Sequence, residues 1–127
     1  MNNIFILLAM IFLHIIDDFK LQAGVLNYLK QKSWWKEQKE YRDLYKYDYI
    51  SALIMHSFSW SFMIMLPIAF ALNFNIGKWI IAYIVNMFIH AFVDDLKANK
   101  LKINLVVDQS IHIVQIVVTW LIFVFMR

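Results

Sequence analysis

The sequence predicts an all-α fold, a bundle of four transmembrane helices, from three features of its composition. Hydrophobic residues make up 62% of the 127 residues and charged residues only 17%, whereas soluble domains are about 45–50% apolar. Two glycines and one proline are too few for a β protein that depends on tight turns. The length suits one domain, so residues 1–127 are expected to form a single integral membrane domain.

The first predicted span covers about residues 4–22. Its apolar run, Ile4 to Ile16, is shorter than the roughly 20 residues that a bilayer requires, so the helix must continue through Asp17 and Asp18. The run has no basic flank before it and no small-residue cleavage site after it, which favours a retained helix over a signal peptide. Two carboxylates are therefore expected near one end of this span.

The segment 23–47 follows the first span and is dense in Lys, Glu and aromatic residues. Such residues favour the headgroup layer, so the segment is predicted to be an interfacial basic and aromatic helical segment. Each of the three apolar stretches after it is long enough to cross a membrane. These later spans cover about residues 49–72, 77–95 and 102–126.

The distribution of basic residues predicts the orientation of the spans. Ten of the twelve Lys and Arg residues lie in the connections after the first and third spans. The positive-inside rule places these connections in the cytoplasm and both termini outside, as in a multi-pass protein of the inner (cytoplasmic) membrane. The net charge of +3 is spread over loops, so a nucleic-acid partner is not expected.

Histidine and aspartate recur at a spacing of four residues in three of the predicted spans. Residues four apart share one face of a helix. Counted along the helices at about 1.5 Å per residue, these pairs and the histidine of the second span fall in one slab roughly 10–15 Å thick near the cytoplasmic side. The candidate metal ligands are His14, Asp18, His56, His90, Asp94, Asp108 and His112.

The residue types limit what this slab could bind. The chain has no cysteine, so a metal would be held by imidazole and carboxylate groups. A divalent cation would also offset the cost of placing charges in membrane helices, about 2.5–3.5 kcal/mol each. Seven candidates exceed one tetrahedral shell, so one or two ions are expected, zinc first and manganese or iron as alternatives. A pair of ions would lie about 3.5–4 Å apart, bridged by Asp18, Asp94 or Asp108.

Simpler interpretations exist for single residues. Asp17 and Asp95 are interpreted as carboxylates solvated among headgroups, and His56 or His112 alone could hydrogen-bond between helices. Asp108 could pair with a lysine of the connection before it. Lysines at helix ends are expected to snorkel to the interface rather than neutralise the carboxylates: Lys20, Lys97, Lys100 and Lys102. Gln22, Asn86 and Gln109 are candidates for orienting the ligands.

Three polar runs carry a family resemblance. The runs from His14 to Gln22, from His90 to Lys97 and from Asp108 to His112 resemble small bacterial and phage membrane proteins of the domain-of-unknown-function 3307 family. More distantly, they resemble membrane-bound metal-dependent hydrolases. The resemblance extends from Phe5 to about Trp120 and leaves the segment 23–47 unexplained. It implies a site that contains every candidate ligand except His56, whose position is less well defined in that family.

The leading interpretation is a metal-dependent hydrolase at the cytoplasmic membrane face that acts on a lipid-like or phosphorylated substrate. A bound divalent ion would lower the pKa of a water towards 7 and polarise the substrate, and Asp18 or Asp94 would be the catalytic general base. One alternative is a metal ion or proton transporter, which four spans would build only as a homo-oligomer. Another is a holin-like or interaction protein without catalysis, which gives no reason for the clustered histidines.

Overall fold

The chain is all-helical, as predicted. The computed structural model describes residues 2–39 and 43–125, and over these residues it contains helices and no strands. The helices, in chain order, are α1 (Asn3–Ile16), the π-helix η1 (Asp17–Leu21), α2 (Val25–Leu29), α3 (Lys32–Lys36), α4 (Asp48–Ala71), α5 (Ile76–Ala98) and α6 (Leu105–Phe125).

Three of these helices are long and apolar enough to cross a membrane: α4, α5 and α6. The first predicted span, about residues 4–22, begins as α1, whose 14 residues extend only about 21 Å. It continues directly into η1, so that the helical stretch ends at Leu21. Asparagine side chains define two of the starts, because Asn2 accepts a hydrogen bond from the Ile4 amide and Asn75 accepts one from the Lys78 amide.

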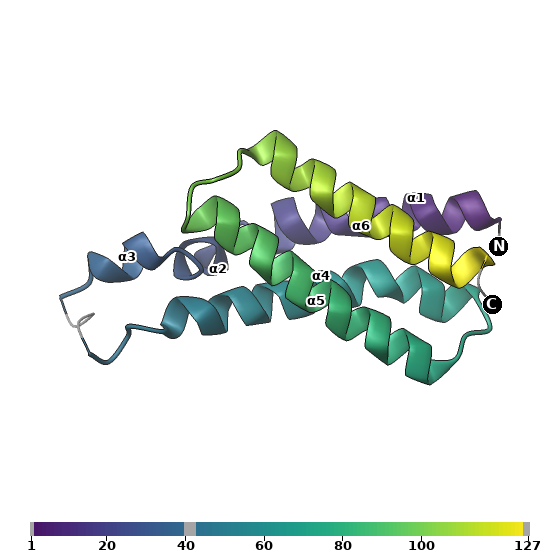
Figure 1. Cartoon of the computed structure of the whole chain (residues 1–127), viewed down its shortest axis with the longest axis horizontal. Coiled ribbons are helices and arrows are strands. Elements are labelled where there is room, and N and C mark those ends of the chain that lie inside the picture. Colours follow the sequence, from purple (N-terminus) through teal and green to yellow (C-terminus); the bar gives the residue numbers. More distant parts are fainter. Residues whose placement is uncertain (1, 40–42, 126–127) are drawn as a thin grey trace.

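The long helices form a bundle whose two ends differ. The chain termini and the α4–α5 turn lie at one end, and α2, α3 and the α5–α6 connection lie at the other (Figure 1). Helix α4 packs against both α1 and α5, and α6 packs against the same two helices. This arrangement brings the cytoplasmic ends predicted for all four spans together.

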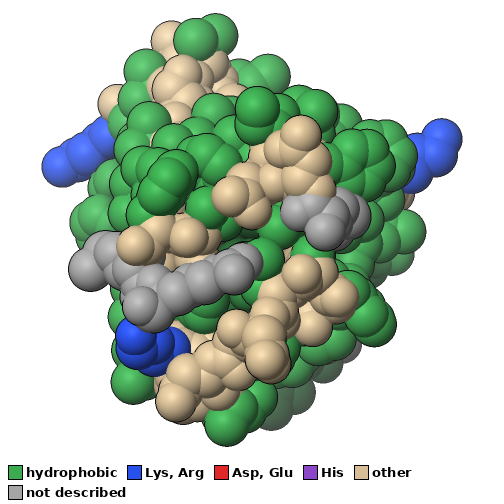
Figure 2. All heavy atoms as spheres, turned by 90° about the vertical axis from the view of Figure 1, so that its right-hand side faces the viewer, with side chains coloured by type: hydrophobic (Ala, Val, Ile, Leu, Met, Phe, Trp, Pro, Cys, Tyr) green, Lys and Arg blue, Asp and Glu red, His purple; other side chains and the backbone are tan. Residues whose placement is uncertain are grey.

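The apolar core fills the half of the bundle nearer the termini. Its fully buried members come from α1, α4 and α6: Ile6, Met10, Trp60, Ile64, Met65, Ile68 and Ile116. Figure 2 shows the terminal end, where hydrophobic side chains and backbone dominate, basic side chains lie at the rim and no acidic or histidine side chain is visible among the described residues. The polar candidates are therefore concentrated toward the opposite end.

The segment predicted to be interfacial contains two short helices, α2 and α3. Asn99, the C-cap of α5, hydrogen-bonds to the backbone of this segment at the junction of α2 and α3. Its side-chain oxygen accepts from the Lys32 amide at 2.6 Å, and its side-chain nitrogen donates to the Lys30 carbonyl at 3.1 Å. The two bonds bracket Lys30 and fix where its side chain enters the bundle.

Candidate metal centre

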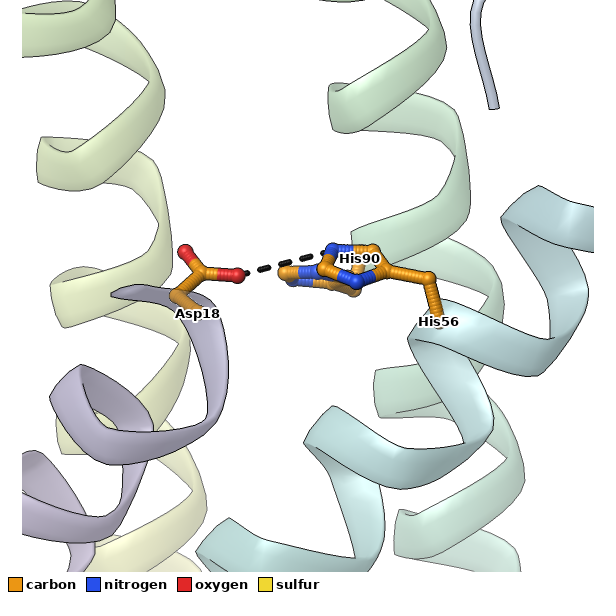
Figure 3. A group of neighbouring side chains, drawn as sticks. All are labelled: Asp18, His56 and His90. Carbon is orange, nitrogen blue, oxygen red and sulfur yellow. Dashed lines mark hydrogen bonds and ion pairs between the residues drawn. The ribbon is translucent and has the colours of Figure 1, made fainter. Parts of the chain in front are cut away.

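The π-helix η1 positions the carboxylates of the first span. In a π-helix the amide of residue i+5 donates to the carbonyl of residue i, and here the Gln22 amide donates to the Asp17 carbonyl at 3.1 Å. The widened turn lets Asp17 and Asp18 both approach the bundle interior. Figure 3 shows Asp18 pointing from this turn toward His56 of α4 and His90 of α5.

The Nε2 atom of His56 is the centre of the cluster. It lies 2.9 Å from Asp94 Oδ2, 3.0 Å from His90 Nε2 and 3.5 Å from Asp18 Oδ1. Donors in a tetrahedral zinc shell with bonds of 2.0–2.1 Å are about 3.3 Å apart, so these separations are of the size that a shared ion requires. The His56, His90 and Asp94 side chains are at most 1% exposed.

Gln22 and Asp17 determine which nitrogen of His56 carries the proton. The Gln22 amide nitrogen donates to the Asp17 carboxylate and to the His56 carbonyl, so its oxygen is the atom 2.5 Å from His56 Nδ1. That oxygen can only accept, and Nδ1 therefore carries the proton. The Nε2 lone pair of His56 is left facing the centre of the cluster, as in a metal-binding histidine.

Asp17 corrects one interpretation from the sequence. It was expected among solvated headgroups, but its side chain is fully buried and accepts a hydrogen bond from Ser59 at 2.7 Å in addition to the one from Gln22. The sequence pattern could not show whether the Asp17 side chain is solvated or buried, because its inward direction depends on the π-helix η1. Asp95 does lie at the periphery, paired with Lys100 at 3.2 Å.

The opposite side of the cluster determines the tautomer of His90. His112 Nε2 faces Asp108 Oδ1 at 3.3 Å and Asp94 Oδ1 at 3.7 Å, and two carboxylate oxygens favour a proton on that nitrogen. With the single proton of a neutral His112 on Nε2, His112 Nδ1 accepts from His90 Nδ1, 3.2 Å away. In that tautomer His90 Nε2 presents a lone pair to His56 Nε2.

Two imidazole lone pairs and two carboxylates thus meet where a cation would satisfy all of them. The site could hold a metal ion, and two groups of three possible ligands share His90: Asp18, His56 and His90, and His90, Asp94 and His112. A neutral imidazole has one lone pair, so His90 can serve only one group at a time. This sharing favours a single ion over the predicted alternative of a bridged pair.

Lys30 enters the same cluster and was not predicted from the sequence. Its ammonium lies 2.6 Å from Asp94 Oδ2 and 3.3 Å from His56 Nε2, although it comes from the end of α2. Nothing in the composition of the segment 23–47 distinguishes this lysine from its exposed neighbours. In this structure its ammonium is the cation nearest to the His56 lone pair.

Lys97 corrects a second expectation. It was predicted to snorkel, but its ammonium lies 2.5 Å from Asp108 Oδ2, which makes it the counter-ion of that carboxylate. The structure therefore confirms the alternative interpretation, in which Asp108 pairs with a nearby lysine. Two of the buried carboxylates thus each face a lysine ammonium, Asp94 that of Lys30 and Asp108 that of Lys97.

His14 supports the cluster from the side. Trp60 Nε1 can only donate, so His14 Nδ1 accepts its hydrogen bond at 2.7 Å, and His14 Nε2 donates to the Gln109 oxygen at 3.1 Å. The Gln109 nitrogen in turn donates to Asp18 and Asp108, both at 3.1 Å. Both nitrogens of His14 are thus used within the protein. His14 acts on Asp18 through Gln109 and through its own Nδ1, 3.9 Å from Asp18 Oδ2.

Trp60 closes the cluster toward the apolar core. Its ring stacks on His90 with centroids 4.1 Å apart and an interplanar angle of 16°.

We predict that Trp60→Phe keeps the stacking on His90 but removes the hydrogen-bond donor to His14, which should lower the free energy of unfolding by about 1 kcal/mol. Thermal unfolding of the detergent-purified variant measures this, with Trp79→Phe as a matched control that loses a bond to the Met65 carbonyl and leaves the cluster intact. Equal metal affinity in Trp60→Phe and wild type would show that the Trp60–His14 hydrogen bond does not affect the site.

A cavity of about 250 Å³ adjoins the cluster on the side of η1, α2 and α6. Among the described residues, Asp18 is the carboxylate that lines it, together with Lys30 and Lys97 and the amide-bearing Asn27 and Gln109. The remaining lining residues are Phe19, Ala23 and Leu105. A molecule in this cavity would therefore reach the cluster through Asp18.

All seven predicted ligands lie in or beside one cluster. Of the predicted orienting residues, Gln22 and Gln109 contact the ligands, whereas Asn86 bonds Thr119 and Gln115 at mid-helix. Comparison of the chain with protein-family models, with curated proteins and with solved structures gives no match. The family resemblance drawn from the three polar runs therefore stays a prediction.

Proposed function

We propose that this chain is a membrane-embedded metal-dependent hydrolase that acts at the cytoplasmic membrane face on a lipid-like or phosphorylated substrate. The observation that carries the proposal is the meeting of His56 Nε2 and His90 Nε2, 3.0 Å apart, beside the carboxylates of Asp94 and Asp18. A divalent ion, zinc first, would supply Lewis acidity there: it would polarise a phosphoryl or carbonyl oxygen and lower the pKa of a water.

The proposal gives the residues of the cluster different tasks. His56, His90 and Asp94 are assigned as ligands because His56 Nε2 lies within 3.0 Å of both His90 Nε2 and Asp94 Oδ2 and all three side chains are enclosed. Asp18 is assigned as the general base because it borders both the cluster and the cavity. Asp108, His112 and His14 orient the others. This assignment reduces the seven predicted ligands to three. Membership of the family that the three polar runs resemble is also part of the proposal.

The substitution Asp18→Asn tests the assigned base. General-base catalysis contributes about 10²- to 10⁴-fold, so hydrolysis of a lipid phosphate should fall by at least about 10²-fold while the metal content stays stoichiometric. Asp95→Asn is the matched control, because Asp95 pairs with Lys100 away from the cavity, and it should retain activity. Loss of the metal in Asp18→Asn would make Asp18 a ligand, and full activity would remove it from the mechanism.

We also propose four spans, with α1 and η1 as the first, and both termini outside. The chain has no cysteine, so single-cysteine variants report topology without background. A membrane-impermeant maleimide applied to intact cells should label Asn3→Cys and Asn73→Cys but not Ser33→Cys. If α1 did not cross, Asn3 and Ser33 would lie on the same side and would label alike.

A second candidate function is a proton relay, favoured by one observation. Successive nitrogen contacts connect Gln22 to Asp108 through His56, His90 and His112, with separations of 2.5, 3.0, 3.2 and 3.3 Å. Intramembrane chains of this kind occur on proton pathways. Proton flux into proteoliposomes that His112→Ala abolishes, in protein stripped of metal, would favour the relay over hydrolysis.

A further inference from the structure

The cavity beside the cluster continues into an apolar groove on the outer face of α6. The groove is shallow and open, because all of its lining residues come from α6: Leu105, Val106, Gln109, Ser110, Ile113 and Val114. Leu105 and Gln109 also line the cavity, so the two spaces meet there. The spacing of the lining residues follows one helix face, whose Val106 and Val114 are exposed and apolar, as a surface in contact with lipid chains should be.

The cavity and the groove differ in the chemistry that they offer. Lys30 and Lys97 line the cavity with the amides of Asn27 and Gln109 and the carboxylate of Asp18. Each lysine pairs with one carboxylate, Lys30 with Asp94 and Lys97 with Asp108, and the remaining N–H donors of the lysines and amides favour an anion with several acceptor oxygens. At about 250 Å³ the cavity falls below the roughly 300–1,000 Å³ of sites that enclose a whole small molecule. It is large enough for a headgroup whose chains remain outside it.

We infer that the substrate of the proposed hydrolase is a lipid phosphate monoester, with its phosphate in the cavity and an acyl or prenyl chain along the α6 groove. The inference rests on the proposed function for the role of the lipid as substrate. The binding itself is separate, because both spaces are built from residues outside the three assigned ligands. An amphiphile would enter sideways from the bilayer, between η1 and α6.

Binding of a fluorescent long-chain phosphatidic acid to the detergent-purified full-length protein tests this without turnover. Asn27 lines the cavity and is exposed, so its charge can be changed in both directions. One charge near such a site contributes about 1 kcal/mol, or about fivefold in affinity. Asn27→Asp should weaken binding by about fivefold, and Asn27→Lys should strengthen it by about the same factor.

The groove has its own pair of variants. Ser110→Phe fills the groove and should weaken lipid binding by about tenfold, the equivalent of fewer than two buried methylenes. Leu121→Phe is the matched control, since Leu121 is a lipid-facing residue of the same helix outside the groove, and it should bind like wild type. Diacylglycerol with the same chains should bind at least about tenfold more weakly than phosphatidic acid.

Three results would overturn the inference: equal binding of diacylglycerol and phosphatidic acid, an unchanged affinity in Ser110→Phe, or inorganic phosphate that competes as well as the lipid. Elemental analysis of the same samples separates this inference from the proposed function. Lipid binding by protein that takes up no metal would leave the lipid site and remove the hydrolase. Stoichiometric metal without lipid selectivity would leave the metal centre and remove the lipid.

Discussion

Replacing His56 with alanine is expected to abolish stoichiometric metal binding by the purified protein. Its Nε2 lies within 3.5 Å of Asp94, His90 and Asp18, and its lone pair is directed inward by the bond from Nδ1–H to Gln22. Without it, the site loses the one donor that lies between His90, Asp94 and Asp18. Elemental analysis after exhaustive dialysis, followed by competition against a zinc chelator, measures the loss.

The matched control is His14→Ala, which removes a histidine of the same slab. His14 has both nitrogens bonded, to Trp60 and Gln109, so it offers no free nitrogen to a metal and acts on the site by holding Gln109 and by lying 3.9 Å from Asp18. Loss of such an orienting residue typically weakens metal binding by about 10- to 100-fold, and the variant should still take up metal in stoichiometric amount. Equal and complete loss in both variants, or retention of metal in His56→Ala, would contradict the assignment.

The helical class and the span-length helices could be predicted because they follow from hydropathy alone. A chain with so few glycines and prolines leaves the backbone little alternative to long helices. The predicted and observed limits agree within a few residues for α4 and α6, since apolar runs end where polar residues begin. The first span is harder, because η1 is a change of hydrogen-bond pattern and Asp17–Leu21 carries no composition that marks it.

The site was predicted where it depends on helical periodicity and missed where it depends on long-range packing. The spacings in α5 and α6 placed His90 with Asp94 and Asp108 with His112, and the structure brings all four together. Lys30 reaches Asp94 across 64 positions of sequence because Asn99 clips the segment after α2 to the end of α5. No local sequence pattern predicts these two hydrogen bonds of Asn99, so the whole segment 23–47 was interpreted as interfacial.

The second large effect is expected from Lys30→Met, and it should have opposite signs for stability and for metal affinity. In metal-free protein the substitution leaves Asp94 without the ammonium 2.6 Å away. Breaking a buried ion pair from one side costs about 3–5 kcal/mol, so the thermal midpoint in chelator should fall steeply. Zinc should restore it, and the zinc affinity should rise by at least about tenfold, because the competing cation at Asp94 and His56 is gone.

Lys97→Met separates this competition from a general loss of ion pairs. Lys97 pairs with Asp108, which is not an assigned ligand, at 2.5 Å. Its ammonium lies 4.0 Å from Asp94, farther than the 2.6 Å of Lys30. Lys97→Met should therefore be destabilised both with and without zinc, and its zinc affinity should not rise. If Lys30→Met instead bound zinc more weakly than wild type and gained no stability from it, Lys30 would be the permanent counter-ion of Asp94. The lone pairs of His56 and His90 would then need no metal to satisfy them, and the imidazole chain of the proton relay would be the better account of why they face each other.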